Sequence, residues 1–246
     1  MVMTKLLPLH RFEQFGLLSE AEREAVLALP GRPYTIDRGQ TILRENDEAR
    51  GFYLLLSGWA AVWNVMPDGG RQIAKIHLPG EPLGTPSMAM RRSTENVLAI
   101  TEVVIANVPL ARFGALFETH PRVAARFLLS VQQERIVLMD RLAAIGRVGA
   151  EASVASFLLD IKERLEPIGL VQDNSFDLMV TQEQIGDVLG LTSVHVNRVL
   201  SSLTSRGLIE RNGRRYRLPN ADLLSATAAR PERQPFPDQD WLPAAR

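Results

Sequence analysis

The chain has 246 residues, which exceeds the usual size of one domain, so two domains are expected. Its 28 Lys and Arg residues balance 28 Asp and Glu residues, which excludes a generally polycationic binder and leaves only a local basic surface. It contains no cysteine, which excludes a disulfide framework and an iron–sulfur cluster held by thiolates.

No segment predicts export or insertion into a membrane. Met1 to Leu9 lacks the long apolar core and the small-residue cleavage site of a secretory signal. The longest apolar stretch, near Tyr53 to Trp63, is interrupted by Ser57 and Gly58 and is shorter than the ~18 residues of a membrane helix. We therefore expect a soluble protein in the cytoplasm.

The N-terminal half is predicted to begin with a short helix and to continue as strands. Ser19-Glu20-Ala21-Glu22 is a capping box, so a helix should precede Pro30-Gly31. From Tyr34 to about Val108, short apolar runs alternate with turns every eight to twelve residues, the spacing of a β-sandwich or small barrel. Between Tyr53 and Trp63 both faces of these runs are apolar, which is typical of strands packed on two sides.

A long helix is predicted from about Pro121 to Arg147, and its apolar positions suggest pairing with a second copy. Four of them lie seven residues apart and two more follow at a distance of four: Ala124, Val131, Leu138 and Ile145, with Leu128 and Leu142. The stripe could also pack only onto its own domain. We expect dimerisation through Val131, Leu138, Leu142 and Ile145, because two-fold symmetry matches the half-site geometry of helix-turn-helix proteins. Gly146 and Gly149 mark the expected hinge.

The C-terminal domain should open with an amphipathic helix from about Ala150 to Leu165, followed by two short helices around a tight turn. Thr181 begins the first of these with a capping box that ends at Gln184. Gly190 permits a sharp turn, and Thr192 caps the second helix. This is the layout of a DNA-reading helix-turn-helix.

The second of these helices has a polar face of small hydrogen-bonding side chains rather than Lys and Glu. They are Ser193, Asn197, Arg198, Ser201 and Ser202. Such a face fits a DNA major groove. Strand-like runs around Asn212-Gly213 then predict a β-hairpin, the wing of a winged helix.

Positive charge is concentrated in the same region. Residues 192 to 218 carry six arginines against one glutamate, a net charge of +5 in a chain whose total is zero. The arginines are Arg198, Arg206, Arg211, Arg214, Arg215 and Arg217. They would lie where DNA phosphates lie. The alternative is a ligand-binding adaptor whose winged helix contacts protein, with the arginines as an ordinary solvated face.

Taken together, these segments resemble the Crp/Fnr family of bacterial transcription regulators, from about residue 10 to 220. The residues that carry the resemblance are Ile36-Asp37-Arg38-Gly39-Gln40-Thr41-Ile42, Glu45-Asn46-Asp47, Tyr53-Leu54-Leu55-Leu56-Ser57-Gly58, Pro67-Asp68-Gly69, Leu78-Pro79-Gly80-Glu81, the helix-turn-helix Thr181 to Leu203 and Gly207-Leu208-Ile209.

The resemblance implies an α+β fold with four parts. The first is a double-stranded β-helix at residues 10–120, a jelly roll like that of cyclic-nucleotide-binding sensor domains. It is followed by a dimerisation helix and hinge at 121–148, a winged helix-turn-helix at 149–221 and a flexible tail at 222–246.

The resemblance also implies a homodimer that binds a palindromic operator and contacts RNA polymerase. The base-reading positions would be Ser193, Val194, Asn197 and Arg198. Arg198 matches the guanine-reading arginine of the family, and Asn197 could read adenine. Val194 replaces the usual glutamate and suits a thymine methyl, so the operator should differ from the best-known family sequences. Contacts to the DNA backbone are expected from Thr181, Thr192, His195, Ser201, Arg211, Arg214 and Arg215.

The effector segment departs from that of cyclic-nucleotide binders. In those proteins a Gly-Glu-Leu run holds the ribose, and an arginine before a small residue and alanine pairs with the cyclic phosphate. Here Thr85 replaces the ribose glutamate, and the phosphate position falls near Ser93, one residue from Arg92. Cyclic AMP is therefore not the expected effector. A pocket for another effector would comprise Gly84, Thr85, Ser87, Arg91, Arg92, Ser93 and Thr94. A regulator that needs no ligand is also compatible with the sequence.

Haem, metal and enzymatic functions are not favoured. Haem would need His77 or Met88, but isolated residues of this kind more often serve in a core or on a surface. A cupin-type enzyme would need clustered histidines, whereas the four histidines here are scattered and form no His-x-His pair. No phosphate-cradling glycine loop and no Gly-x-Ser-x-Gly motif is present, so we predict no catalytic residues and no metal ligands.

Overall fold

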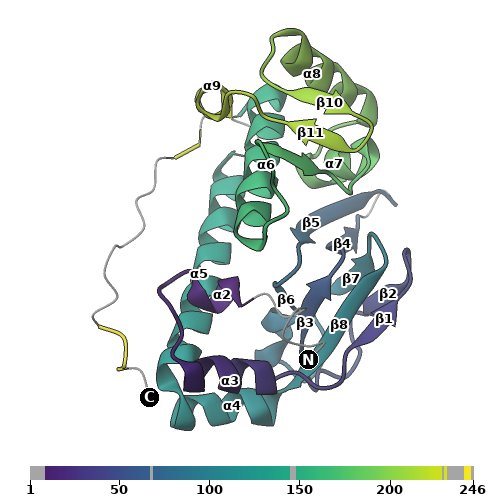
Figure 1. Cartoon of the computed structure of the whole chain (residues 1–246). Coiled ribbons are helices and arrows are strands. Elements are labelled where there is room, and N and C mark those ends of the chain that lie inside the picture. Colours follow the sequence, from purple (N-terminus) through teal and green to yellow (C-terminus); the bar gives the residue numbers. More distant parts are fainter. Residues whose placement is uncertain (1–8, 67–68, 145–147, 229, 232–240, 245–246) are drawn as a thin grey trace. The chain divides into compact units, whose positions relative to one another are not determined.

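The computed structural model describes residues 9–66, 69–144, 148–228, 230–231 and 241–244. These residues divide into two compact units (Figure 1). The first contains the described residues of 9–64, 75–136 and 241–244, and the second contains those of 65–74 and 137–231. None of the helices in the described part of the chain is long and apolar enough to cross a membrane.

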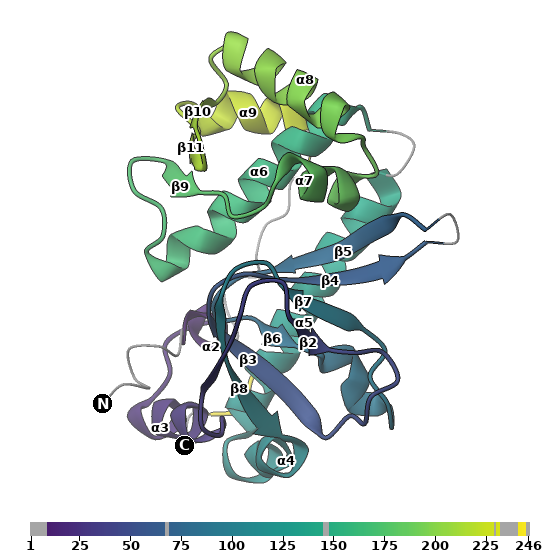
Figure 2. The same ribbon diagram turned by 90° about the vertical axis from the view of Figure 1, so that its right-hand side faces the viewer.

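The first unit is built on a β-roll, as the turn spacing predicts. Its strands are β1 Tyr34–Ile36, β2 Thr41–Leu43, β3 Gly51–Ser57, β4 Ala60–Val65, β5 Arg71–His77, β6 Pro82–Leu83, β7 Asn96–Ala99 and β8 Val103–Pro109. They form two four-stranded sheets, in the orders β1-β8-β3-β6 and β2-β7-β4-β5. In both sheets the strand pairs for which a register is defined are antiparallel (Figure 2).

Strand β3 is buried on both faces, which explains its run of leucines. Leu55 packs inside the roll in a cluster with Val62 and Ile105. Leu54 and Leu56 point to the opposite face, where they join a second core cluster. The alternation follows from the two-residue period of a strand. The prediction of strands packed on two sides is therefore confirmed.

Helices cover the outer face of β3. They are α2 His10–Glu13, α3 Glu20–Ala28, α4 Leu110–Thr119 and α5 Pro121–Ala144, and in both views α3 and α4 lie together at one end of the roll (Figures 1 and 2). Phe52 of β3 meets Phe113 of α4 edge to face at 5.3 Å and Phe127 of α5 at 5.3 Å. The capping box at Ser19 begins α3 as predicted, whereas α2 and α4 were not predicted.

The second unit is a winged helix. Its elements are α6 Ala150–Leu165, the 3-10 turn η2 Glu166–Ile168, β9 Ser175–Asp177, α7 Gln182–Leu189, α8 Ser193–Ser205, β10 Glu210–Asn212, β11 Arg215–Arg217 and α9 Ala221–Ala228. Strand β11 of the hairpin β10–β11 also pairs with β9, which makes a three-stranded antiparallel sheet in the order β10-β11-β9. The predicted helices and the hairpin are present, and β9 is an addition to them.

The predicted tail requires a correction. Residues 221–228 form α9, in which Leu224 is completely buried, so the prediction of a flexible tail from residue 222 is wrong for this stretch. The proline signal on which that prediction depended begins only at Pro231, after the helix has ended. Most of the later tail lies outside the described residues, as do Ile145 of the predicted seam and Gly146 of the predicted hinge.

Candidate nucleic-acid interface

Local contacts fix the start of α7 and the turn between α7 and α8. Thr181 Oγ1 accepts a hydrogen bond from the backbone N–H of Gln184 at 3.2 Å, and Gln184 Oε1 accepts one from the N–H of Thr181 at 2.9 Å. Gly190 ends α7 in the left-handed conformation, with φ 67°. Gly186 was not singled out from the sequence, yet a Cβ there would lie 2.4 Å from the carbonyl oxygen of Leu191. A larger residue at 186 would therefore force the two helices apart.

Helix α8 buries one face and exposes the predicted base-reading residues. Its buried side chains are Val196, Val199, Leu200 and Leu203. Ser193, Val194, Asn197 and Arg198 are all exposed, and Val194 is 69% exposed. An apolar side chain left in water at the start of a helix contributes little to the fold, so this position is available for an apolar contact with a partner.

Two predicted backbone-contact residues also cap the helices. Thr192 Oγ1 accepts a hydrogen bond from the N–H of His195 at 3.2 Å, as Thr181 does at the start of α7. A threonine hydroxyl that accepts such a bond can still donate its own hydrogen. Both hydroxyls can therefore cap a helix and bind an anion at the same time.

Three of the six arginines in this region form ion pairs, so the local charge is smaller than the sequence suggests. Arg206 pairs with Glu151, Arg217 pairs with Glu210 at 3.1 Å, and Arg215 lies 3.6 Å from Asp177. These pairs are exposed, so water screens them and each is weak. Glu151 and Asp177 precede residues 192–218 in the chain, which is why a count over that window missed them.

Arg198 and Arg214 differ from the other arginines. Both are exposed, and within the described residues neither side chain forms a hydrogen bond or an ion pair. Arg198 lies on α8, and Arg214 lies in the turn between β10 and β11. Two guanidinium groups whose donors all face solvent are thus placed on the helix and on the wing, where an external anion or base can reach them.

Arg211 and Ser201, which were both predicted to contact the DNA backbone, have partners within the protein. Arg211 Nη2 donates to Ser201 Oγ at 3.2 Å and to Asn197 Oδ1 at 3.4 Å. Arg211 also pairs with Tyr216 across the hairpin. Tyr216 is only 5% exposed and stacks on Phe176, so the strand position of Arg211 is fixed beside the core of the winged helix.

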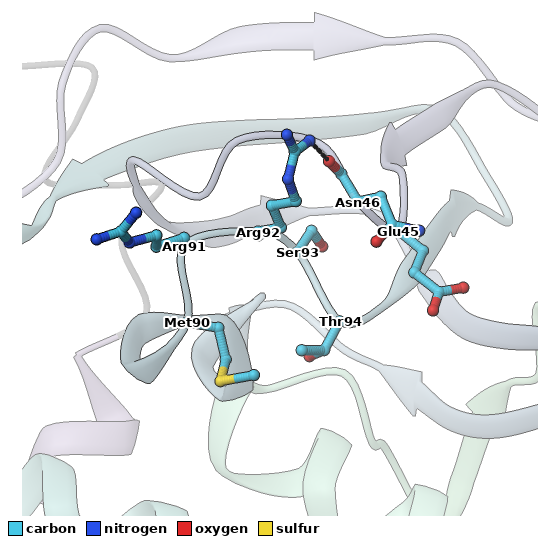
Figure 3. Close-up of a pocket in the computed structure, with 7 residues that line it drawn as sticks. All are labelled: Glu45, Asn46, Met90, Arg91, Arg92, Ser93 and Thr94. Carbon is cyan, nitrogen blue, oxygen red and sulfur yellow. Dashed lines mark hydrogen bonds between the residues drawn. The ribbon is translucent and has the colours of Figure 1, made fainter.

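The predicted effector segment forms an open groove of about 340 Å³ on the β-roll (Figure 3). It is lined by Glu45, Asn46, Met90, Arg91, Arg92, Ser93 and Thr94. Arg92 turns toward the loop and donates to the carbonyl oxygen of Asn46 at 2.7 Å, whereas the Arg91 side chain extends away from it (Figure 3). Four predicted pocket residues, Arg91 to Thr94, are therefore brought together, while Gly84, Thr85 and Ser87 do not line this groove.

Hydrogen bonds within the protein hold the residues around Ser93. Ser93 occupies the position expected for the phosphate-binding arginine, and its hydroxyl donates to the carbonyl oxygen of Glu95 at 3.0 Å. Ser87 Oγ accepts a hydrogen bond from the N–H of Thr94 at 3.1 Å. Burial raises the pKa of Glu95, which shows that its surroundings disfavour a negative charge. The polar groups of Ser87, Ser93 and Thr94 therefore bond within the protein, and the guanidinium groups of Arg91 and Arg92 belong to the same groove.

A buried ionic cluster in the first unit was not predicted from the sequence. Glu81 is 1% exposed and bonds to Arg11, with Lys75 at 3.6 Å and His77 at 3.4 Å. Lys75 also pairs with Glu134 of α5 at 2.8 Å. Burial, with a smaller contribution from Lys75, lowers the pKa of His77 from 6.5 to about 4, although Glu81 and Glu134 act in the opposite direction. His77 is therefore a neutral core residue at pH 7 in this structure, which agrees with the reading of it as a core histidine.

The helix α5 exposes apolar side chains along the predicted seam. Leu128, Leu138 and Leu142 are 55%, 44% and 62% exposed. Ala124 is buried and Val131 packs against the core of the first unit, so the N-terminal part of the stripe serves its own domain. The C-terminal part therefore remains available for another molecule.

Comparison with protein families and individual proteins gives a consistent result. The family described as "Cyclic nucleotide-binding domain" matches residues 34–120, and the family described as "Crp-like helix-turn-helix domain" matches residues 152–227. The nitrogen fixation regulation protein FixK of Bradyrhizobium diazoefficiens is 31% identical over 179 residues, which are 73% of this chain and 74% of FixK.

Two further proteins extend the match. The fumarate and nitrate reduction regulatory protein of Escherichia coli K12 is 23% identical over 211 residues, which are 86% of this chain and 84% of that protein. The solved structure of FixK2 from Bradyrhizobium japonicum superposes with a TM-score of 0.72 at 27% identity and covers 82% of this chain and 98% of FixK2.

Proposed function

Because this chain belongs to the Crp/Fnr family of transcription regulators, we propose that it acts as a homodimer whose two α8 helices bind an inverted-repeat operator. Like its relatives, the chain is a DNA-binding regulator and not an enzyme. The observation that supports the proposal most strongly is the exposed face of α8, on which Arg198 points to solvent without a protein partner. The adaptor alternative receives no support from the relatives.

Four residues on α8 would read the bases. Arg198 would donate to O6 and N7 of a guanine, the most common specific contact of an arginine. Val194 would pack against the methyl group of a thymine, because an apolar tip cannot accept a hydrogen bond from cytosine. Ser193 and Asn197 would hydrogen-bond to neighbouring base edges.

A second set of residues would hold the DNA backbone. These are Thr181, Thr192, His195, Ser201, Arg211, Arg214 and Arg215. Arg214 is the strongest candidate among them, because its guanidinium group is exposed at the tip of the hairpin. Thr181 and Thr192 would donate their hydroxyl hydrogens to phosphates at the N-termini of α7 and α8, where the helix dipoles also attract anions.

The dimer would form through α5, with Leu138 and Leu142 facing their equivalents and with Ile145 continuing the seam beyond the described residues. Val131, which was also predicted in the seam, packs against the core of its own domain instead. In this arrangement residues 10–120 act as the sensor, 121–148 as the dimerisation helix and hinge, and 149–221 with α9 as the DNA-binding domain. The partner in transcription would be RNA polymerase, and the regulator would work in the cytoplasm, where bacterial DNA lies.

The seam can be tested with a matched pair of variants. Leu138→Glu places a charge in the proposed interface and should convert the dimer to monomers in sedimentation velocity. Val137→Glu is the control, because Val137 is similarly exposed, at 39%, but points away from the stripe by about 100° around the helix. A Leu138→Glu protein that remained dimeric would show that α5 pairs differently or does not pair at all.

The effector would not be cyclic AMP, because Thr85 and Ser93 supply neither the carboxylate nor the guanidinium group that a cyclic nucleotide requires. Calorimetric titration of the full chain with cyclic AMP should therefore give no saturable heat in the micromolar range. Micromolar binding that Arg92→Ala abolishes would contradict this. We propose neither an iron–sulfur cluster, since cysteine is absent, nor haem, since His77 is buried beside Glu81.

A further inference from the structure

A contact between β10 and α8 suggests that an arginine of the hairpin determines which base an asparagine of α8 recognises. Arg211 of β10 donates to Asn197 Oδ1 at 3.4 Å and to Ser201 Oγ at 3.2 Å. We infer that Arg211 is a positioning residue that decides which base Asn197 recognises. This inference depends on the proposed base-reading role of α8.

The chemistry of the two side chains fixes the orientation of the Asn197 amide. A guanidinium group has five hydrogen-bond donors and no acceptor, so only the oxygen of the amide can face it. The Nδ2 group of Asn197 must then point to the other side. The assignment does not depend on distinguishing nitrogen from oxygen in the structure, because the opposite orientation would place two donors against each other.

The position of Arg211 along α8 determines where the Nδ2 group points. Ser193, Asn197 and Ser201 are four residues apart and therefore lie on the same face of the helix. Since Arg211 contacts both Asn197 and Ser201, it lies toward the C-terminal end of that face. The Nδ2 group consequently points toward Ser193, the end that enters the groove in the proposed complex.

This orientation changes the base that Asn197 prefers. An unrestrained asparagine reads adenine by accepting from N6 and donating to N7 at the same time. With Oδ1 held by Arg211, Asn197 presents only donors to the bases. Its partner is then a hydrogen-bond acceptor in the major groove, O6 or N7 of guanine or O4 of thymine. Adenine is disfavoured because its only acceptor there, N7, lies beside the N6 donor group.

Arg211 is suited to this role because it is held before DNA binds. It is half-buried, pairs with Tyr216 across the hairpin and already donates to Ser201 Oγ and Asn197 Oδ1 in the protein without DNA. Arg214, which lies in the exposed turn of the same hairpin, has no such support within the described residues. One arginine of the wing is thus fixed to the protein, while the other remains available for phosphates.

The test compares binding selections from random duplexes for four full-length proteins: wild type, Asn197→Ala, Arg211→Met and Arg214→Met. The base pair at which Asn197→Ala loses its preference identifies the Asn197 contact. There the wild type should select guanine or thymine. Arg211→Met should shift the preference toward adenine by about three- to tenfold, the value of one hydrogen bond. Arg214→Met removes the same charge from the same hairpin and should reduce the affinity for all sequences by a similar factor.

A double variant separates positioning from phosphate binding. In the Asn197→Ala background, Arg211→Met should leave the base preference unchanged, because the amide that Arg211 orients is gone. Thermal unfolding of each variant checks that the winged helix is intact.

Two results would overturn the inference. The first is selection of adenine at the Asn197 position by the wild type. The second is a folded Arg211→Met protein that binds every sequence more weakly by the same factor, as expected for Arg214→Met. That result would make Arg211 a phosphate contact. Failure of the wild type to enrich any sequence would instead contradict the proposed function, and the inference would fall with it.

Discussion

In the first unit the charged side chains of Arg11, Lys75 and Glu81 are held against one another, whereas in the winged helix Arg198 and Arg214 extend into solvent without a partner in the described residues. Both groups come from a chain whose formal charges cancel. A buried charge must be compensated within the protein, because its removal from water costs about several kcal/mol. An exposed charge has no such requirement and can be neutralised by a ligand.

The difference shows where each domain is constrained. Replacing one member of the buried cluster should affect stability, because its partners would remain charged in a poorly solvated site. Replacing Arg198 or Arg214 should leave stability nearly unchanged and affect only DNA binding, because neither side chain forms a hydrogen bond or an ion pair within the described residues. Variants in the two regions therefore test this difference.

The largest effect is expected for Glu81→Gln. The variant leaves Arg11 and Lys75 with a single buried carboxylate between them, so it should lower the free energy of unfolding by about 3–5 kcal/mol. Urea denaturation of the full chain measures the loss. Glu48→Gln, which removes an exposed partner of Arg50, is the control and should change stability little. Equal stability of the two variants would contradict a structural role for the cluster.

Arg198→Ala should reduce binding to the selected operator by about 1–3 kcal/mol and relax the choice of base at one position. The expected loss on random duplex is much smaller, because that binding depends mainly on phosphates. Fluorescence anisotropy on both duplexes measures the difference. Parallel losses on operator and random DNA would remove Arg198 from the base-reading set.

His77 should make stability depend on pH. Its pKa is lowered from 6.5 to about 4 by burial, so between these values the unfolded chain binds more protons than the folded chain. Stability should therefore fall as the pH decreases from about 6.5 toward about 4, by up to about 1 kcal/mol per pH unit from this residue. His77→Gln should make the dependence shallower. Identical slopes for the wild type and His77→Gln would refute the assignment.

Arg214→Ala should have the smallest effect. Loss of one phosphate contact lowers the slope of the logarithm of the binding constant against the logarithm of salt concentration by about 0.9. It also reduces the affinity for all sequences by a similar factor. Arg50→Ala in the β-roll removes the same charge far from the winged helix in the sequence and serves as the control. A salt slope that Arg214→Ala left unaltered would show that the wing does not contact phosphates.

The sequence predicted those parts of the structure that depend on short-range signals. The capping box at Thr181 and Gln184, the turn at Gly190 and the hairpin at Asn212-Gly213 all involve residues within a few positions of each other, and all are present. The exposure of Val194 and Arg198 follows from the 3.6-residue period of α8. Their roles on DNA remain predictions.

The sequence could not predict contacts between distant residues. Arg11 and Glu81 are 70 positions apart, and Glu151 pairs with Arg206 across 55 positions. Such pairs depend on how helices and strands pack and leave no periodic pattern. The three-residue strand β9 is too short to produce a pattern of its own. The error in the tail arose because prolines after Pro231 dominated the composition and hid the amphipathic turn around Leu224.

The most direct test of the account is selection and sequencing of random duplexes on the full-length protein at about 0.15 M salt, where the attraction of phosphates alone is weak. We expect enrichment of an inverted repeat whose half-sites lie about 10–10.5 base pairs apart, the spacing of one turn of DNA. Enrichment of a single half-site, or of no sequence with any tested ligand, would contradict a dimer whose two α8 helices read the bases.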